Sequence, residues 1–152
     1  MTGASSGIGA ATAAALAAQG ATVALAARRR DRLDELAAQI RGQGGTALVL
    51  ECDVTQQDQA AAAVERTVAE LGRLDTLVNN AGVMLLGPAA GAPLAEWQQM
   101  VELNVLGLLY CAHAALPTCC APPRTAHARS RTWSTSARWP AGTPAAGTGS
   151  TR

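Results

Sequence analysis

Short apolar segments alternate with helical segments over the first 117 residues of the chain. Apolar runs rich in Val, Leu and Ala predict three strands, at 22–27, 46–51 and 74–79. Spacings of three and four between apolar residues predict helices at 10–19, 31–41, 57–71 and 94–116, with Pro117 ending the last. Strands separated by helices imply a parallel sheet covered on both faces. The sequence therefore predicts an α/β fold, a doubly wound parallel sheet.

Composition narrows the class of protein. The 152 residues suit one domain, 49% of them are hydrophobic, 15% are charged, and the net charge is +1. This balance gives no electrostatic reason to expect a nucleic-acid partner. The sequence has no run of about 18 strongly apolar residues, so we expect no membrane span. The opening residues lack the pattern of a signal peptide. We therefore expect a cytoplasmic protein.

The four cysteines offer little to a metal or a disulfide. Cys52, Cys111, Cys119 and Cys120 show no paired C-x-x-C spacing, and adjacent cysteines are poorly placed to share one zinc ion. We expect neither a metal site nor a disulfide.

A glycine-rich loop, TGASSGIG, stands at residues 2–9, directly before a predicted helix. Glycines permit a tight turn and close backbone approach, so that a pyrophosphate can lie on the amides of the helix N-terminus. A glycine-rich loop alone also fits an ordinary turn. The spacing is G-x-x-x-G-x-G, which differs from the usual G-x-G-x-x-G of dinucleotide sites.

Three further motifs follow the glycine loop in order. Asp53 stands in CDV after the second predicted strand, NNAG occupies 79–82 after the third, and Asn104 lies within ELNVLG. Together with the loop, they make residues 2–117 resemble the classical short-chain dehydrogenase/reductase family. The stretch VMLLGP after NNAG is also similar to clavulanate-type dehydrogenases.

The resemblance assigns roles to these residues. It implies an oxidoreductase that moves hydride between a nicotinamide cofactor and an alcohol or carbonyl, usually as a homo-oligomer. Asn104 would be the catalytic asparagine that kinks its helix and holds a water in a proton relay, although one Asn in a helix is also compatible with no role. NNAG is also compatible with a plain turn. The implied cofactor-binding residues are Gly3, Ser5, Ser6, Gly7, Ile8 and Gly9 at the pyrophosphate, Asp53 and Val54 at the adenine, and Asn80, Ala81 and Gly82 at the ribose.

Arginines at the end of the first predicted strand bear on the cofactor. Arg28, Arg29 and Arg30 stand where an acidic residue would bind the ribose 2′-hydroxyl of NAD. A guanidinium suits a 2′-phosphate instead. We expect NADP rather than NAD, with Arg28 as the preferred contact and Arg29 beside it. The alternative is a solvated start to the next helix.

The chain departs from the family in two places. It contains no lysine and one tyrosine, Tyr110, whereas the family's chemistry needs a Tyr-Lys pair with a Ser. The buried strand that precedes the family's glycine loop is missing, so backbone groups of its neighbours are expected to lack partners. We therefore expect an incomplete domain without dehydrogenase turnover. A non-catalytic nucleotide-binding or interaction protein is the alternative function.

Residues 118–152 differ in character from the rest. They contain five arginines, no acidic residue, and many Pro, Gly, Ser and Thr, which predicts a disordered tail after a domain at 1–117. Read one base out of frame, codons for this stretch permit the family's Ser strand and Tyr in order. We interpret the tail as frameshifted, with a genuine linker as the alternative, so its Ser134 and Ser136 inherit no catalytic role.

Overall fold

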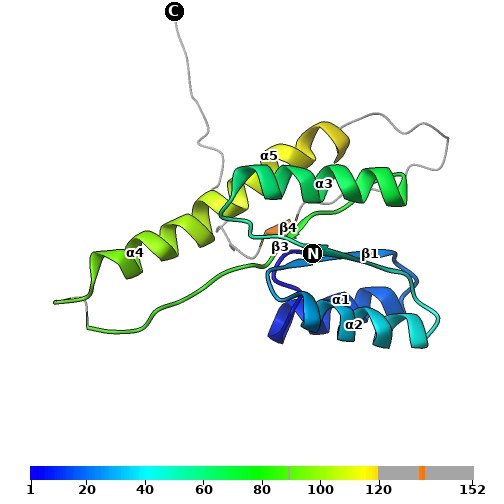
Figure 1. Ribbon diagram of the computed structural model, residues 1–152, viewed down its shortest axis with the longest axis horizontal. Helices are drawn as coiled ribbons and strands as arrows, with labels where there is room; N and C mark the ends of the chain where they lie inside the picture. Colours follow the sequence, from blue (N-terminus) through cyan, green and yellow to red (C-terminus); the bar gives the residue numbers. More distant parts are fainter. Residues whose placement is uncertain (89, 120–133, 136–152) are drawn as a thin grey trace, which may run out of the picture.

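The computed structural model describes residues 1–88, 90–119 and 134–135 (Figure 1). Its elements alternate as predicted, and each helix follows a strand or a short loop. In chain order they are α1 (Gly7–Ala18), β1 (Val23–Ala27), α2 (Arg30–Gly42), β2 (Ala47–Glu51), α3 (Gln57–Leu71), β3 (Val78–Asn79), α4 (Leu94–Val101), a π-helical turn (Glu102–Gly107), α5 (Leu108–Cys119) and β4 (Ser134–Thr135).

The strands pair in parallel. β1 pairs with β2 from Val23 opposite Ala47 to Ala27 opposite Glu51, and β3 pairs with β4. α1 and α2 lie on one face of these strands, and α3 and α5 lie on the other (Figure 1). The prediction of a parallel sheet wound on both faces is confirmed.

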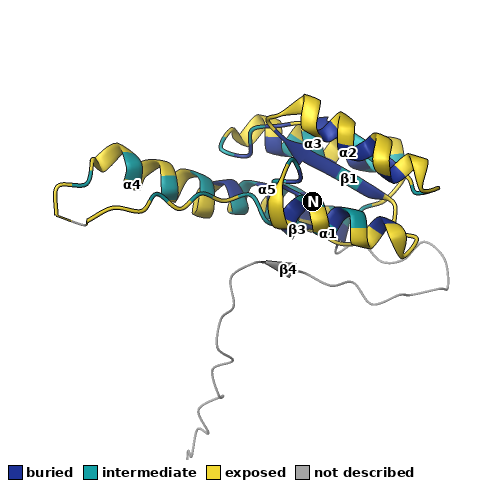
Figure 2. Cartoon of the chain, turned by 90° about the horizontal axis from the view of Figure 1, so that it is seen from below, coloured by how far each residue is buried: buried dark blue, intermediate teal, exposed yellow. Residues whose placement is uncertain are grey.

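Each face of the sheet has its own core. Leu25 and Leu33, both fully buried, belong to the core beneath α1 and α2. Leu50, Val64 and Leu77 belong to the core beneath α3 and α5. Adjacent β1 residues such as Leu25 and Ala26 point to opposite faces, because side chains alternate along a strand. Figure 2 accordingly shows β1 as buried between exposed outer helix faces.

Residues Met1 and Thr2 occupy the place between β1 and β3. The Thr2 N–H donates to the Val78 carbonyl at 3.0 Å, and the Ala26 N–H donates to the Met1 carbonyl at 3.0 Å. The Met1 amino group donates to the Ala24 carbonyl at 2.9 Å, and burial lowers its pKa to about 6. The expectation that the neighbouring strands lack a shared partner was therefore too strong, since two residues join them.

Three predicted elements have boundaries that were wrong. The first helix, expected at 10–19, begins at Gly7 and ends at Ala18. The strand expected at 74–79 is confined to Val78–Asn79. The helix expected at 94–116 divides into α4, a π-helical turn and α5, and it continues through Pro117 to Cys119. Pro117 lacks an N–H donor, but it lies in the last turn of α5, where one missing hydrogen bond does not end the helix. The helix therefore continues for two residues beyond Pro117.

The predicted tail contains one described element, β4, whose two residues pair with β3. The domain boundary predicted at 117 remains a prediction. Residues 120–133 and 136–152 lie outside the described part of the chain, as does the interpretation of that stretch as frameshifted.

The continuous helical run Leu94–Cys119 passes a length and composition test for a membrane span, with a mean hydropathy of 1.3 over its best 18 residues. The expectation that no segment is apolar enough was therefore too strict. This helix also packs against α3 and carries Asn104, so it belongs to the α/β fold.

Candidate functional site

The glycine loop turns sharply into α1. Gly3 and Gly7 have φ values of 65° and 55°, in the left-handed region that glycine adopts without strain. α1 begins at Gly7, and no acidic side chain occupies its first turn. The first N–H groups of a helix have no partners within the helix. This end of α1 therefore offers backbone donors and a positive dipole to an anion.

A hollow of about 400 Å³ opens beside this helix end. Twelve of the thirteen predicted cofactor-binding residues line it; Gly7 lies at the turn itself and does not. The twelve are Gly3, Ser5, Ser6, Ile8, Gly9, Arg28, Arg29, Asp53, Val54, Asn80, Ala81 and Gly82. They come from the glycine loop and first turn of α1 and from the segments that follow β1, β2 and β3, which meet at one edge of the sheet as the parallel topology requires.

Close backbone contacts join the glycine loop to the NNAG loop. A Cβ at Gly9 would lie 2.3 Å from the Gly3 oxygen and 2.5 Å from Asn80 Nδ2. A Cβ at Gly3 would lie 2.8 Å from the Ala81 Cα. Only glycine fits at Gly9 without displacing the neighbouring loop.

The Thr2 hydroxyl holds the two loops together. It accepts the N–H of Asn80 at 3.0 Å and that of Ala81 at 3.1 Å, and it lies 3.4 Å from the Val78 carbonyl, to which it donates. The Asn80 side-chain amide returns bonds to the carbonyls of Thr2 and Gly3. Thr2 is 5% exposed, so water competes little for these bonds.

Arg29 lies across the glycine loop. Its Nη2 donates to Ser6 Oγ at 2.7 Å and to Ser5 Oγ at 3.1 Å, and its Nε donates to Ser5 Oγ at 3.3 Å. Arg30 points elsewhere, because its guanidinium pairs with Asp34 at 3.5 Å. Arg28 also lines the hollow. Two of the three arginines thus face the hollow.

The far wall of the hollow follows β2. Asp53 Oδ1 accepts the N–H and the hydroxyl of Thr55, which fixes the turn before α3. Gly107 packs closely against Val54, since a Cβ at Gly107 would lie 3.0 Å from Val54 Cγ2. The turn and this close contact hold Asp53 and Val54 at the hollow.

Asn104 lies in the π-helical turn and does not line the hollow. Its Oδ1 accepts the Val83 N–H at 2.9 Å, and its Nδ2 donates to the Val83 carbonyl at 2.8 Å. The side-chain amide therefore holds the loop after NNAG against the long helix. π-helical turns often mark functional positions, but the predicted catalytic role of Asn104 remains a proposal.

Sequence reasoning missed several residues of the site. Leu103, Ala26, Ala27 and Cys52 also line the hollow, and Thr2 organises it from behind. The strand positions follow from geometry, because residues at the carboxyl ends of parallel strands face the same edge. Thr2 had a signal in the motif itself, where it precedes the first glycine.

Two thiols lie deep in the second core. Burial raises the pKa of Cys52 and of Cys111 to about 11. At Cys52, the nearby Cys111 and Asp53 add to this rise in the pKa. The thiolate is the reactive form, so both should be inert. We predict that iodoacetamide at pH 8 labels neither thiol in the folded chain and labels both in urea, as peptide mapping would detect.

The same thiols predict a pH dependence. Folded thiols stay protonated until about pH 11, whereas unfolded ones ionise near 9.0, so the unfolded state binds fewer protons above that pH. The stability that these protonated thiols contribute should be fully present below pH 9 and should be lost toward pH 11, as urea unfolding at a series of pH values would measure. Labelling of native Cys111 at pH 8 would contradict both expectations.

The fold and the hollow define a class of protein. A parallel α/β sheet, a glycine loop leading into a helix N-terminus, and a hollow at the carboxyl ends of the strands are the features of a Rossmann-like dinucleotide-binding domain. Short chain dehydrogenases match residues 1–125, and the chain belongs to that family.

Individual relatives agree with this membership. An uncharacterized oxidoreductase of Listeria monocytogenes is 39% identical over 118 residues, which cover 78% of this chain and 48% of that protein. The structure of a short-chain type dehydrogenase/reductase from Mycobacterium marinum matches with a TM-score of 0.74 and 44% identity, over 77% of this chain and 47% of the other.

A third similar structure contains a cofactor analogue. It is an alcohol dehydrogenase from the archaeon Thermococcus sibiricus complexed with 5-hydroxy-NADP, with a TM-score of 0.75 and 33% identity, over 78% of this chain and 51% of the other. The chain thus spans about half the length of the relatives it matches.

Proposed function

We propose that this chain is the NADP-binding half of a short-chain dehydrogenase/reductase that moves hydride between the nicotinamide and an alcohol or carbonyl. Arg29 carries the proposal, because it lies across Ser5 and Ser6 beside an open helix N-terminus. The residues present fit a dinucleotide, since the glycine loop, the start of α1 and the NNAG loop together line a hollow of about 400 Å³. When bound, the cofactor supplies the hydride chemistry.

The chain's own residues divide the binding task. The amides at the start of α1 suit the pyrophosphate, and the loop at 80–82 borders the ribose. Arg28 and Arg29 place two cations at the end of β1, where a 2′-phosphate would lie. Asp53 also lines the hollow, after the end of β2, and its carboxylate accepts the N–H and the hydroxyl of Thr55. The charge at the end of β1 therefore favours NADP over NAD.

A direct test compares the two reduced cofactors. Arg29→Gln removes charged hydrogen bonds worth about 1.5–3 kcal/mol, so NADPH should bind roughly tenfold or more weakly while NADH changes little. Arg28→Gln should have the same sign. Titration followed by nicotinamide fluorescence measures each dissociation constant.

Arg32→Gln is the matched control, because Arg32 pairs with Glu35 on the exposed side of α2. It should leave both affinities unchanged. If the wild-type chain binds NADPH and NADH equally, or if Arg29→Gln weakens both cofactors alike, the proposed NADP preference is wrong.

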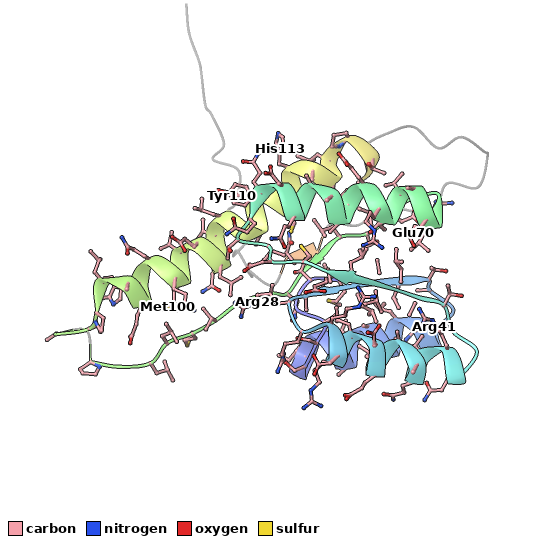
Figure 3. All side chains as sticks on the ribbon, viewed as in Figure 1. Arg28, Arg41, Glu70, Met100, Tyr110 and His113 are labelled. Atoms are coloured by element: carbon pink, nitrogen blue, oxygen red, sulfur yellow. The ribbon has the colours of Figure 1, made fainter. Side chains whose placement is uncertain are left out.

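We further propose that the polypeptide has no dehydrogenase turnover by itself. The sequence has no lysine, and Tyr110 lines a separate groove between α3 and α5, where Figure 3 shows it near His113 on the outer side. The proton transfer to a carbonyl thus lacks a positioned acid at the hollow. NADPH absorbance with a panel of ketones and aldehydes should match a no-protein blank; consumption above that blank would contradict the proposal.

The intact protein would act in the cytoplasm on a small-molecule alcohol or carbonyl, as a homo-oligomer. These proposals rest on family membership.

A further inference from the structure

A glycine lies in the middle of the long helix. Gly107 is the last residue of the π-helical turn, and α5 begins at the next residue. Figure 1 shows α4, this turn and α5 as one continuous helical run. Glycine is less favourable than alanine inside a helix, because it loses more backbone freedom and adds no side chain to the packing. Gly107 is nevertheless buried, so a reason other than helix propensity favours glycine here.

The segment after β2 lies directly against Gly107. A Cβ at Gly107 would lie 3.0 Å from Val54 Cγ2, 3.2 Å from the Val54 carbonyl oxygen and 3.4 Å from the Val54 carbonyl carbon. Two of these three atoms are backbone, so a new rotamer of Val54 alone would not make room for a methyl group. Glycine therefore lets the long helix approach the segment after β2 more closely than alanine would.

The same π-helical turn also contacts the wall of the hollow that follows β3. Leu103 lines the hollow directly. The Asn104 side chain forms two hydrogen bonds with the Val83 backbone, and its Oδ1 would lie 3.1 Å from a Cβ at Gly82, which is another lining residue. The turn is therefore held to the loop after β3 through Asn104, and it packs against the segment after β2 through Gly107.

We infer that Gly107 is a positioning residue that sets the width of the hollow beside Val54 and thereby selects for a flat base at that wall. Asn104 holds the turn at Val83, so a methyl group at Gly107 would move Val54 toward the hollow more easily than it would move the helix away. Closely packed interiors pass such a displacement on to their neighbours. The inference rests on the proposed function, because it takes the adenine of NADP as the base.

The test compares two ligands of the hollow by calorimetry. Adenosine 2′,5′-bisphosphate carries the base, whereas inorganic pyrophosphate carries no base. Gly107→Ala should weaken binding of the bisphosphate roughly tenfold and leave that of pyrophosphate within about twofold, because overpacking strains the wall at Val54 and not the start of α1. A purely structural role for Gly107 would weaken both ligands alike. Gly42→Ala is the matched control, because a Cβ at this helical glycine of α2 meets nothing within 4 Å, and it should leave both affinities unchanged.

A second variant covers the case in which Gly107→Ala fails to fold. Val54→Ala removes the Cγ2 atom that the new methyl group would meet, so the double variant should recover folding and part of the bisphosphate affinity that Gly107→Ala loses. Unchanged bisphosphate affinity in Gly107→Ala, an equal loss for both ligands, or a double variant no better than Gly107→Ala would each overturn the inference. These results leave the proposed function standing if the wild-type chain binds NADPH. A wild-type chain that binds neither NADPH nor the bisphosphate would overturn both.

Discussion

Replacing Gly9 with alanine should abolish dinucleotide binding by this chain. The new Cβ would lie 2.3 Å from the Gly3 oxygen and 2.5 Å from Asn80 Nδ2, both closer than any van der Waals contact. The Gly3 oxygen is backbone, so relief requires the glycine loop and the NNAG loop to separate. Overpacking of this kind costs about 1–3 kcal/mol of stability, and the glycine loop proposed to bind the pyrophosphate would lose its shape.

The measurement is NADPH titration together with urea unfolding. We expect no saturable binding at millimolar NADPH and a lower unfolding midpoint. Gly87→Ala is the matched control, because a Cβ at Gly87 meets nothing within 4 Å. Wild-type affinity in Gly9→Ala would show that the contact between the two loops does not shape the site.

Much of this architecture could be predicted from sequence. Apolar runs such as Val23–Ala27 are buried on both faces, and that burial produces the continuous pattern from which parallel strands are recognised. The glycine spacing could be read because a left-handed φ at Gly3 and a close approach at Gly9 each exclude other residues. These are local constraints, and they leave local marks.

The features that were missed depend on contacts between distant residues. Nothing near Leu74 indicates that the strand before NNAG shortens to Val78–Asn79, because that length depends on the neighbours available for pairing. The contact between Asn104 and Val83 likewise joins residues 21 positions apart: the Asn104 side chain accepts the Val83 N–H and donates to the Val83 carbonyl. Propensity and periodicity do not report such partners.

The arginines give an intermediate case. The sequence placed a cation at the end of β1 and preferred Arg28, whereas the structure places Arg29 across Ser5 and Ser6. A run of three arginines fixes the local charge but leaves open which guanidinium turns toward the loop. Arg30 turns away because Asp34, one helical turn later, pairs with it.

Contacts between the loops make the site largely preformed. The Asn80 side chain, the Gly9 backbone and the Thr2 hydroxyl meet where the two loops touch, without a ligand between them. A site held in this way loses little conformational freedom when a ligand binds, and preorganisation raises affinity for that reason. Thr2, whose hydroxyl joins the two loops, should therefore contribute both to stability and to cofactor binding.

Thr2→Val should therefore be the most disruptive change that preserves side-chain shape. Valine replaces the hydroxyl with a methyl group, which leaves the N–H groups of Asn80 and Ala81 without their acceptor in a position that is 5% exposed at Thr2. Each unsatisfied buried group costs about 1–3 kcal/mol, so the two groups together should lower the free energy of unfolding by about 2–6 kcal/mol. Urea unfolding followed by circular dichroism measures that loss.

Thr2→Ser separates the hydroxyl from the packing of the methyl group. Serine keeps the acceptor for Asn80 and Ala81, so it should retain most of the stability and the NADPH affinity that valine loses. Equal losses in the two variants would assign the effect to the methyl group and would contradict a role for the hydroxyl. Met1 and Thr2 also form backbone hydrogen bonds with Ala26 and Val78, so loss of this junction in Thr2→Val should loosen β1 from β3. Amide hydrogen exchange at Ala26 should therefore become faster in Thr2→Val but not in Thr2→Ser.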